Sequence, residues 1–381
     1  MMTDVTKTRK TVFQGFVLML ALLFATGCGK AAPQETTGES RAQSTTLTVS
    51  TTTASTTRQP TATPMPTRVP VNMNPLTGQY SMDPENAGKR PVAIMFSNIQ
   101  VALPQLGIGS ADLYYEMVVE SGYTRLMALF ADANTIPEVL SIRSTRDSFV
   151  DVAMGHDAVL VHFGASVLCW DYMAREGIQT LDLQFYAAGC WRDPQVAAER
   201  GAEHSVKTNA ELVTAAIPGK GLRGTLSEDA QLPFTFRHPE SFVPADGADC
   251  ESFSVPFTAW STSPTAGFDY DDTTRTYAKS QYGGLHIDGT TGEPIRVTNV
   301  LVLFTTIYPL DPYGHVAARL TEGGEGYYLS GGKLQEIRWD KGGIYDPLVY
   351  TTLDGETLTL NAGKTYVCIL TSEMQGNVQY K

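Results

Sequence analysis

Strand-like and helix-like runs alternate between residues 137 and 177, and this alternation constrains the fold more than any other feature. The runs 137–143 and 157–163 are apolar and strand-like, whereas 145–155 and 166–177 have helical spacing, the last ending at Gly177. A strand, a helix and a second strand of these lengths form a βαβ unit, whose strands pair in parallel with a right-handed crossover. We therefore expect an α/β domain with a mixed, partly parallel sheet.

The neighbouring segments supply further elements of the same domain. Residues 91–97 form a strand, and 209–219 form a helix. The stretch 113–130 is rich in Tyr, Val, Leu and Met on both sides of Ser121-Gly122, which indicates a β-hairpin. A helix is the alternative for its first half, because Leu113, Met117 and Glu120 also recur at helical spacing.

The character of the sequence changes at about residue 225. Short runs of Val, Ile, Tyr, Phe and Thr alternate with turn dipeptides, and no run of helical period follows. We expect a mainly β domain, either a sandwich or an open barrel, over 225–381, after an α/β domain over 72–224.

The N-terminus indicates where the protein resides. Lys7, Arg9 and Lys10 precede the apolar run 12–25 and the sequence "TGC". A basic start, a short apolar run and small residues before Cys28 are typical of a secretory signal peptide, here 1–27. The final "ATGC" is similar to a bacterial lipobox, so we expect Cys28 to be lipidated and to hold the chain on the outer face of the cytoplasmic membrane. The alternative is a plain signal peptide with an incidental cysteine.

Residues 28–71 comprise this cysteine and a segment dominated by Thr, Ser and Pro. Bulky apolar residues are nearly absent from it, so folding would not bury enough surface to offset the entropy of ordering the chain. We expect a disordered tether between membrane and folded domains.

The charge and the cysteines exclude some functions. The formal net charge is −12, which disfavours binding of nucleic acid, so an anionic ligand would need a local cluster of arginines. No C-x-x-C spacing indicates zinc, and we expect no cofactor and no metal. Buried free thiols are the simplest interpretation of the remaining cysteines, namely Cys169, Cys190, Cys250 and Cys368.

The strongest candidate site surrounds Arg143 and Arg146. Ser144 and Asp147 resemble a capping box, so we expect a helix to begin there. Free N–H groups at a helix start, flanked by two guanidinium groups, form an anion receptor. The negative partner is a ligand's phosphate or carboxylate or, alternatively, a carboxylate of the protein such as Glu116 or Glu120.

Geometry adds to this expectation. If 137–143 and 157–163 are neighbouring parallel strands, Arg143 and His162 lie together at their carboxyl ends, where α/β sheets bind ligands. Ser166 then lies at the start of the next helix. The competing interpretations are an internal salt-bridge network for the arginines and a hydrogen-bonded core residue for His162.

Two further clusters carry polar chemistry. The segment 191–209 contains Arg192, Asp193, Arg200, His204 and Lys207, and it belongs either to the same pocket or to an exposed loop. His286 and Asp288 alternate along a strand and thus share a face. An H-x-D pair can bind a metal, but no third ligand stands at a defining spacing, and a polar strand end is the simpler interpretation.

The segments "NPLTG", "RPVAIMFSN", "ADLYYEMVVESGYTRLMALF", "SIRSTRDSFVDVA" and "DAVLVHFGAS" together resemble the YerB-type bacterial lipoprotein family over roughly residues 74–375. The resemblance implies an N-terminal domain of unknown function followed by a distinct C-terminal domain, and an envelope lipoprotein without an established activity. The family's short motifs correspond here to Glu116, Glu120, Gly122, Thr124, Arg125, Arg143, Arg146, His162, Gly164, Ser166, His204, His286, Asp288 and Gly292. Both neighbours of His204 differ from the family's pattern.

Two functional hypotheses follow. The first is a non-catalytic, membrane-tethered envelope protein whose pocket holds an anionic or sugar-containing ligand such as a cell-wall fragment, with a second surface for an envelope protein. The second is a hydrolase or transferase acting on envelope polymers, with Glu120 or His162 as general acid or base. No nucleophile motif favours the second. The ligand-binding candidates are Glu116, Glu120, Arg125, Arg143, Arg146, His162, Ser166 and His204.

Overall fold

A computed structural model of the chain describes residues 72–381. The predicted signal peptide (1–27), the lipidation site Cys28 and the tether to residue 71 lie outside the described residues. Within the described part, no helix is both long enough and apolar enough to cross a membrane.

An eleven-stranded mixed sheet forms the centre of the fold. From one edge to the other its order is β10 (Ala248–Asp249), β20 (Lys333–Lys341), β19 (Gly324–Ser330), β16 (Asn299–Thr305), β23 (Thr365–Thr371), β2 (Leu113–Val118), β3 (Thr124–Phe130), β1 (Val92–Ser97), β5 (Val159–His162) and β6 (Leu181–Asp182), with β21 (Leu348–Thr352) beside β20. The sheet thus combines strands from before and after residue 225. The predicted division of the chain at that residue stays a prediction.

Most strands at the centre of this sheet point the same way. β5 pairs in parallel with β1 and β6, and β23 pairs in parallel with β2 and β16. β3 is antiparallel to both β1 and β2. It follows that six of these strands run in the same direction, namely β1, β2, β5, β6, β16 and β23. Their carboxyl ends therefore lie at one edge of the sheet.

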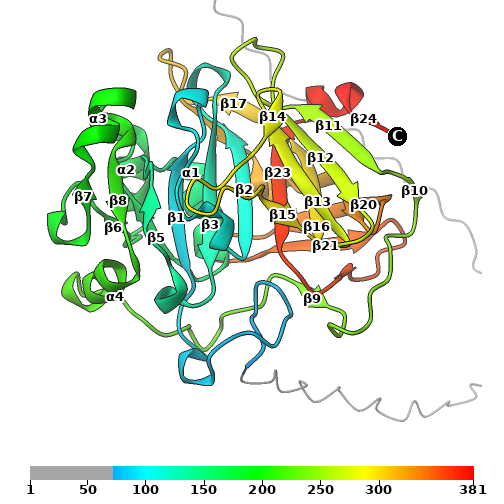
Figure 1. The fold of residues 1–381 in the computed structure, drawn as a ribbon, viewed down its shortest axis with the longest axis horizontal. Helices are drawn as coiled ribbons and strands as arrows, with labels where there is room; N and C mark the ends of the chain where they lie inside the picture. Colours follow the sequence, from blue (N-terminus) through cyan, green and yellow to red (C-terminus); the bar gives the residue numbers. More distant parts are fainter. Residues whose placement is uncertain (1–71) are drawn as a thin grey trace, which may run out of the picture. The chain divides into compact units, whose positions relative to one another are not determined.

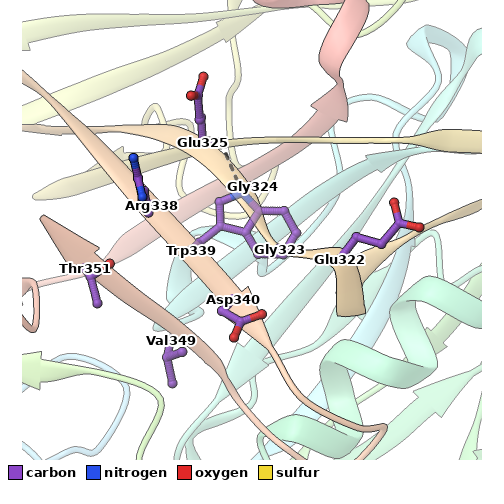
Figure 2. Close-up of a pocket in the computed structure, with 9 residues that line it drawn as sticks. All are labelled: Glu322, Gly323, Gly324, Glu325, Arg338, Trp339, Asp340, Val349 and Thr351. Carbon is purple, nitrogen blue, oxygen red and sulfur yellow. Dashed lines mark hydrogen bonds between the residues drawn. The ribbon is translucent and has the colours of Figure 1, made fainter. Parts of the chain in front are cut away.

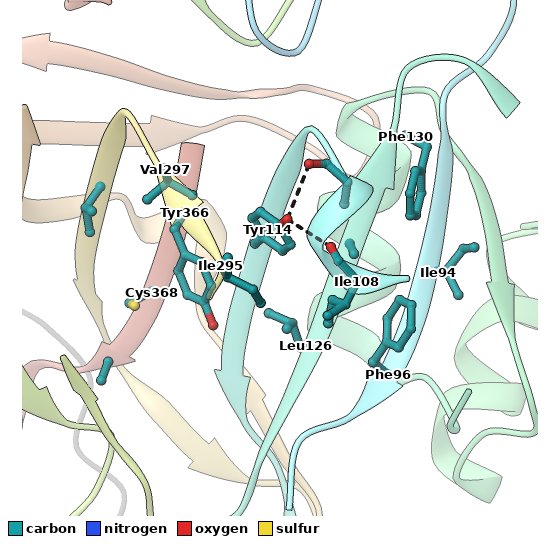
Figure 3. Packing of buried hydrophobic residues seen from close by; sticks show 14 of the residues in the cluster. Ile94, Phe96, Ile108, Tyr114, Leu126, Phe130, Ile295, Val297, Tyr366 and Cys368 are labelled. Carbon is teal, nitrogen blue, oxygen red and sulfur yellow. Dashed lines mark hydrogen bonds between the residues drawn. The ribbon is translucent and has the colours of Figure 1, made fainter. Parts of the chain in front are cut away.

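A second, six-stranded sheet covers one face of the first. Its order is β14 (Gly284–Leu285), β13 (Thr276–Gln281), β12 (Thr265–Asp271), β11 (Ser252–Pro256) and β24 (Gln379–Tyr380), with β15 (Arg296–Val297) beside β13. Alternate side chains of the central strands meet this sheet, so Ile94, Phe96, Tyr114 and Tyr366 lie in one buried cluster with Val297 (Figure 3). Burial of each such side chain stabilises the fold by about 1.5–3 kcal/mol.

Helices cover the opposite face and the β6 edge. α1 (Asp147–Gly155) and α2 (Val167–Arg175) pack against the other alternate residues, such as Met95 and Leu129. α3 (Pro194–Arg200) and α4 (Ala210–Gly219) lie beyond β5, on the side away from the C-terminal strands (Figure 1). Three small sheets complete the fold: β4 (Val139–Leu140), β8 (Val206–Thr208) and β7 (Trp191–Arg192); β17 (Ile307–Pro309) and β18 (Val316–Ala318); and β22 (Thr359–Leu360) and β9 (Thr235–Phe236).

These elements confirm the predicted fold class, an α/β N-terminal region with a partly parallel sheet followed by a region made mostly of strands. The hairpin 113–130 is confirmed as β2 and β3, and the three predicted helices are α1, α2 and α4. The four cysteines within residues 72–381 are free thiols.

The predicted pairing of 137–143 with 157–163 is wrong. β5 pairs with β1, and β4 pairs with β8 in a small sheet. The reason is that β1 occupies the position beside β5, and residues 141–145 enter only where these two strands end. There Arg143 donates its N–H to the carbonyl of Met95 at 2.9 Å, and its own carbonyl accepts from the N–H of Phe163 at 3.1 Å.

The predicted capping box at Ser144 is also wrong. α1 begins after Arg146, which has extended backbone angles, and no side chain caps the helix. Ser144 donates its hydroxyl hydrogen to the carbonyl of Phe163 at 3.0 Å. Ser144 thus serves to join two loops at the sheet edge rather than to start the helix.

Candidate functional site

The turn between β2 and β3 carries Glu120 at the carboxyl edge of the parallel strands. Ser121 and Gly122 adopt left-handed backbone angles, with φ of 59° and 75°. Glycine favours this region and serine seldom adopts it. The tight turn directs the Glu120 carboxylate back toward the loop before α1.

Two arginines converge on Glu120. Arg146 donates its Nε–H to Glu120 Oε1, and the Arg125 guanidinium lies 3.8 Å from Glu120 Oε2. Burial alone would raise the pKa of Glu120, but the hydrogen bond and charge of Arg146, together with the charge of Arg125, hold it below its usual value. The carboxylate therefore stays ionised at neutral pH.

His315, from the C-terminal half, completes this group. Its Nε2 lies 3.7 Å from Glu120 Oε1, and its Nδ1 lies 2.6 Å from Asp311 Oδ2. Sequence reasoning missed both residues, since "LDPYGHV" looks like an ordinary turn between short strands. We call Glu120, Arg125, Arg143, Arg146 and His315 the Glu120 cluster.

Arg143 differs from the other arginines of the cluster, because its side chain has no protein partner. Among residues 72–381, none accepts a hydrogen bond from its guanidinium or lies within 4.0 Å as an acid. Burial lowers the pKa of Arg143. The charges of Glu203 and Glu120 raise this pKa, and the charge of Arg146 lowers it. A half-buried guanidinium therefore feels the charges of two carboxylates without forming an ion pair with either.

His204 is close enough to Arg143 to be affected by its charge. Its side chain is buried, and its Nδ1 has no hydrogen-bond partner among the described residues. Nε2 is 3.9 Å from Glu203 Oε1. Burial lowers the pKa of His204, and the charge of Arg143 lowers it further, so the ring is neutral at pH 7. The Nδ1 atom of His204 is thus a buried polar atom without a partner in the described part of the chain, within range of the Arg143 charge.

His162 and Ser166 have internal roles in the structure. His162 is fully buried, with Nδ1 at 2.8 Å from the carbonyl of Gly164 and Nε2 at 2.8 Å from Thr180 Oγ1. Burial lowers the pKa of His162, although the nearby charge of Asp182 raises it in part. Ser166 caps α2 by accepting the N–H of Cys169 at 3.1 Å.

Glu116 also lies inside the fold, between the two large sheets. It accepts hydrogen bonds from Asn98, Thr124 and Tyr366 at 2.6–2.8 Å, and Lys279 Nζ lies 3.7 Å away. The Glu116 and Lys279 side chains are both fully buried. This pair links β2 to β13 and lies in the core rather than in the Glu120 cluster.

His286 and Asp288 anchor a loop of the N-terminal half. His286 Nε2 lies 2.8 Å from Gln105 Oε1, and Asp288 accepts the N–H groups of Gly107 and Gly109 at 3.1 and 2.6 Å. The region described holds no group of three or more His, Cys, Asp or Glu residues arranged to bind a metal.

The segment 191–209 forms β7, α3 and β8 rather than one loop. Arg192 donates to Ser205 Oγ at 3.3 Å, and its guanidinium lies 4.7 Å from the centre of the Phe163 ring. Lys207 pairs with Glu138 and Asp193 at 2.7 and 2.8 Å. Arg192, Glu203 and His204 are the residues of this segment whose charges interact with Arg143. Sequence reasoning missed α3, although Asp193-Pro194 is a helix start signal.

Two hollows are relevant to ligand binding. One of about 510 Å³ adjoins the Glu120 cluster, since Ser121 and Gly122 line it together with Trp260 and Tyr313. Another, of about 560 Å³, lies over β19, β20 and β21 (Figure 2). Its Trp339 is buried and donates Nε1–H to the carbonyl of Glu325 at 3.1 Å, and its Arg338 is exposed, so this hollow has no half-buried guanidinium like that of Arg143.

Known proteins are similar to this chain in sequence and in fold. The model of the N-terminal domain of a protein of unknown function (DUF3048) matches residues 76–223, and the model of its C-terminal domain matches 254–367. The "Putative lipoprotein YerB" of Bacillus subtilis (strain 168) is 26% identical over 305 residues, which cover 78% of this chain and 85% of that protein.

The crystal structure of the YerB protein from Bacillus subtilis has a similar fold. The TM-score is 0.68 at 23% identity, and the match covers 81% of this chain and 98% of that chain. At this identity the likeness shows the fold alone, so the function of the site has to be argued from its own residues.

Proposed function

Since the chain belongs to the DUF3048 family, whose function is unknown, we propose from the chain's own geometry that it is a membrane-anchored, extracytoplasmic binding protein that captures an anionic ligand at Arg143. Cys28 carries the lipid in this proposal, and residues 29–71 act as the tether. The lipobox-like sequence and a relative named as a lipoprotein support the anchor.

The unpaired guanidinium of Arg143 carries the proposal. Partial burial of a charged group costs free energy unless an opposite charge or hydrogen bonds compensate. Glu120 is already engaged with Arg146, and Glu203 lies beyond ion-pairing distance of Arg143. A phosphate or carboxylate is the partner that a planar guanidinium binds best, through two parallel hydrogen bonds.

The local charge supports an anion as the ligand. Arg125, Arg143, Arg146 and Arg192 gather around Glu120 and Glu203, with Asp311 bonded to His315 of the same group. Several guanidinium groups close together are what a chain with a net charge of −12 needs to hold a negative ligand.

The protonation states favour binding over proton transfer. A general acid needs a raised carboxyl pKa, and Arg146 keeps the pKa of Glu120 low. His162 engages both ring nitrogens within the protein. We therefore rank the envelope-polymer hydrolase or transferase below the binding protein.

Titration calorimetry of the full-length chain in detergent with inorganic phosphate tests the proposal. We expect saturable binding that weakens with added salt, and a loss of affinity of about tenfold or more in Arg143→Ala, because a bidentate charged hydrogen bond is removed. Arg175→Ala is the matched control, since the Arg175 side chain is 66% exposed, pairs with Glu176 and lies over the Tyr172 ring, on α2.

Equal affinity of Arg143→Ala and the wild type would contradict the proposal. Incubation of the same protein with cell-wall fragments addresses the alternative, because the release of products that depends on Glu120 would identify an enzyme.

A further inference from the structure

We infer that the hollow beside Trp260 and Tyr313 holds a sugar ring, so that the ligand of the Glu120 cluster is an acidic saccharide. This inference rests on the proposed anion site and specifies the class of ligand that the site binds.

The hollow has the chemistry of a saccharide site. Trp260 is 63% exposed and Tyr313 is 87% exposed, although both line it. The two rings are open to solvent within one hollow, and their flat apolar faces match the C–H faces of a sugar ring. Hydroxyl and carboxylate groups that can bond to sugar hydroxyls surround them, from Ser121, Thr371 and Glu373.

The β2–β3 turn holds Trp260 in place. Thr262 donates its hydroxyl hydrogen to the carbonyl of Ser121 at 2.6 Å, and the N–H of Trp260 bonds to Thr258 Oγ1 at 3.1 Å. Gly122 packs so closely that a Cβ atom there would lie 3.0 Å from Trp260 Cβ. The indole is thus held by its backbone while its ring stays exposed, which reduces the entropy lost on binding.

The loop 311–315 fixes Tyr313 from the other side. Asp311 Oδ1 accepts the N–H groups of Tyr313 and His315 at 2.9 and 3.1 Å, while Asp311 Oδ2 bonds to the His315 ring. His315 in turn lies 3.7 Å from Glu120.

The hollow and the Glu120 cluster therefore share one turn and one loop. Ser121 and Gly122 line the hollow, whereas the preceding residue, Glu120, binds the arginines. A ligand that extends across this turn places a sugar ring at Trp260 and a negative group at the arginines. A saccharide with a carboxylate on or next to its ring meets both requirements.

The test uses the full-length chain in detergent and three probes. N-acetylglucosaminyl-N-acetylmuramic acid carries sugar rings and a carboxylate, chitobiose carries similar rings without the charge, and inorganic phosphate carries only the charge. We expect the acidic disaccharide to bind about tenfold more tightly than chitobiose, and to change the tryptophan fluorescence.

The variants separate the two halves of the site. Trp260→Ala should weaken binding of the acidic disaccharide about tenfold and leave phosphate binding unchanged, because stacking is lost and the arginines remain. Tyr313→Ala should act in the same direction. Tyr345→Ala is the control, since Tyr345 is an exposed tyrosine that lines a different hollow.

Each outcome decides between the two claims. If phosphate binds but the disaccharide does not, or if Trp260→Ala and Tyr313→Ala bind the disaccharide like the wild type, the saccharide inference is overturned and the anion site stands. If the disaccharide and chitobiose bind equally through Trp260 and phosphate does not bind, the hollow holds a sugar ring, but the anion site fails and with it the claim that the ligand is acidic. If neither probe binds, both fail.

Discussion

His315 Nε2 lies 3.7 Å from Glu120 Oε1, so the C-terminal half of the chain completes a charged cluster that the N-terminal half begins. The contact forms because β2 and β16 share one direction in the central sheet. Their carboxyl ends therefore deliver the Glu120 turn and the 311–315 loop to the same edge, where open α/β sheets bind ligands.

Arg143 and Arg146 should differ in their effects on stability. Arg146→Met removes the partner of the partly buried Glu120 and should lower the free energy of unfolding by about 1–3 kcal/mol. Arg143→Met breaks no side-chain hydrogen bond or ion pair among residues 72–381 and should change this free energy by no more than about 0.5 kcal/mol. Urea unfolding measures both, and similar losses for the two variants would show that Arg143 has a partner in the protein.

The buried pair of Glu116 and Lys279 should be strongly coupled. Glu116→Gln keeps the shape of the side chain but leaves the fully buried ammonium of Lys279 unpaired, at a cost of about 3–5 kcal/mol. Adding Lys279→Met should recover most of this loss. A double-mutant cycle by chemical denaturation gives the coupling energy, and additive losses would mean that the pair does not act as a unit.

Stability should fall as the pH falls below 6.5. Burial, with the nearby charge of Lys341, lowers the pKa of His156 to about 3. The unfolded chain takes up the proton near pH 6.5 and the folded chain does not, so the neutral ring favours folding above that pH. The free energy of unfolding should thus drop by about 2 kcal/mol between pH 7 and pH 5 for this residue alone.

The buried rings of His162 and His286, whose pKa values burial also lowers, add to the same trend. His156→Gln should reduce the slope of stability against pH over this interval, while His238→Gln, which changes an exposed residue, should retain it. A slope unaffected by His156→Gln would show that the ring is protonated in the native state.

Cys28→Ser should release the protein from the membrane. Without the lipid, the predicted signal peptide would still direct export but no acyl chain would hold the protein, so it should appear in the culture medium instead of the membrane fraction. Fractionation with metabolic fatty-acid labelling measures this, with Cys190→Ser as the control that keeps the label. Membrane retention of unlabelled Cys28→Ser protein would argue for a different anchor.

Local signals in the sequence were sufficient to predict many of the helices and strands. The Ser121-Gly122 turn predicted the hairpin, and the period of 145–155 predicted α1. The predicted partner of β5 was wrong, because an apolar run does not specify which strand lies beside it. β1 and 137–143 are both short and apolar, and only the packing of the complete sheet decides between them.

The charged residues were found more readily than their partners. Arg143, Arg146 and Glu120 stood out by their spacing, whereas His315 and Trp260 lie in loops whose position depends on contacts far apart in the sequence. His162 looked like a site residue because its hydrogen bonds to Gly164 and Thr180 cannot be seen in the sequence.

A crystal structure of the protein soaked with phosphate tests the central claim most directly. The account predicts density for the anion within about 3 Å of the Arg143 guanidinium, beside His204. Density that shows Arg143 paired with Glu203 or Glu120, with no anion bound, would contradict it.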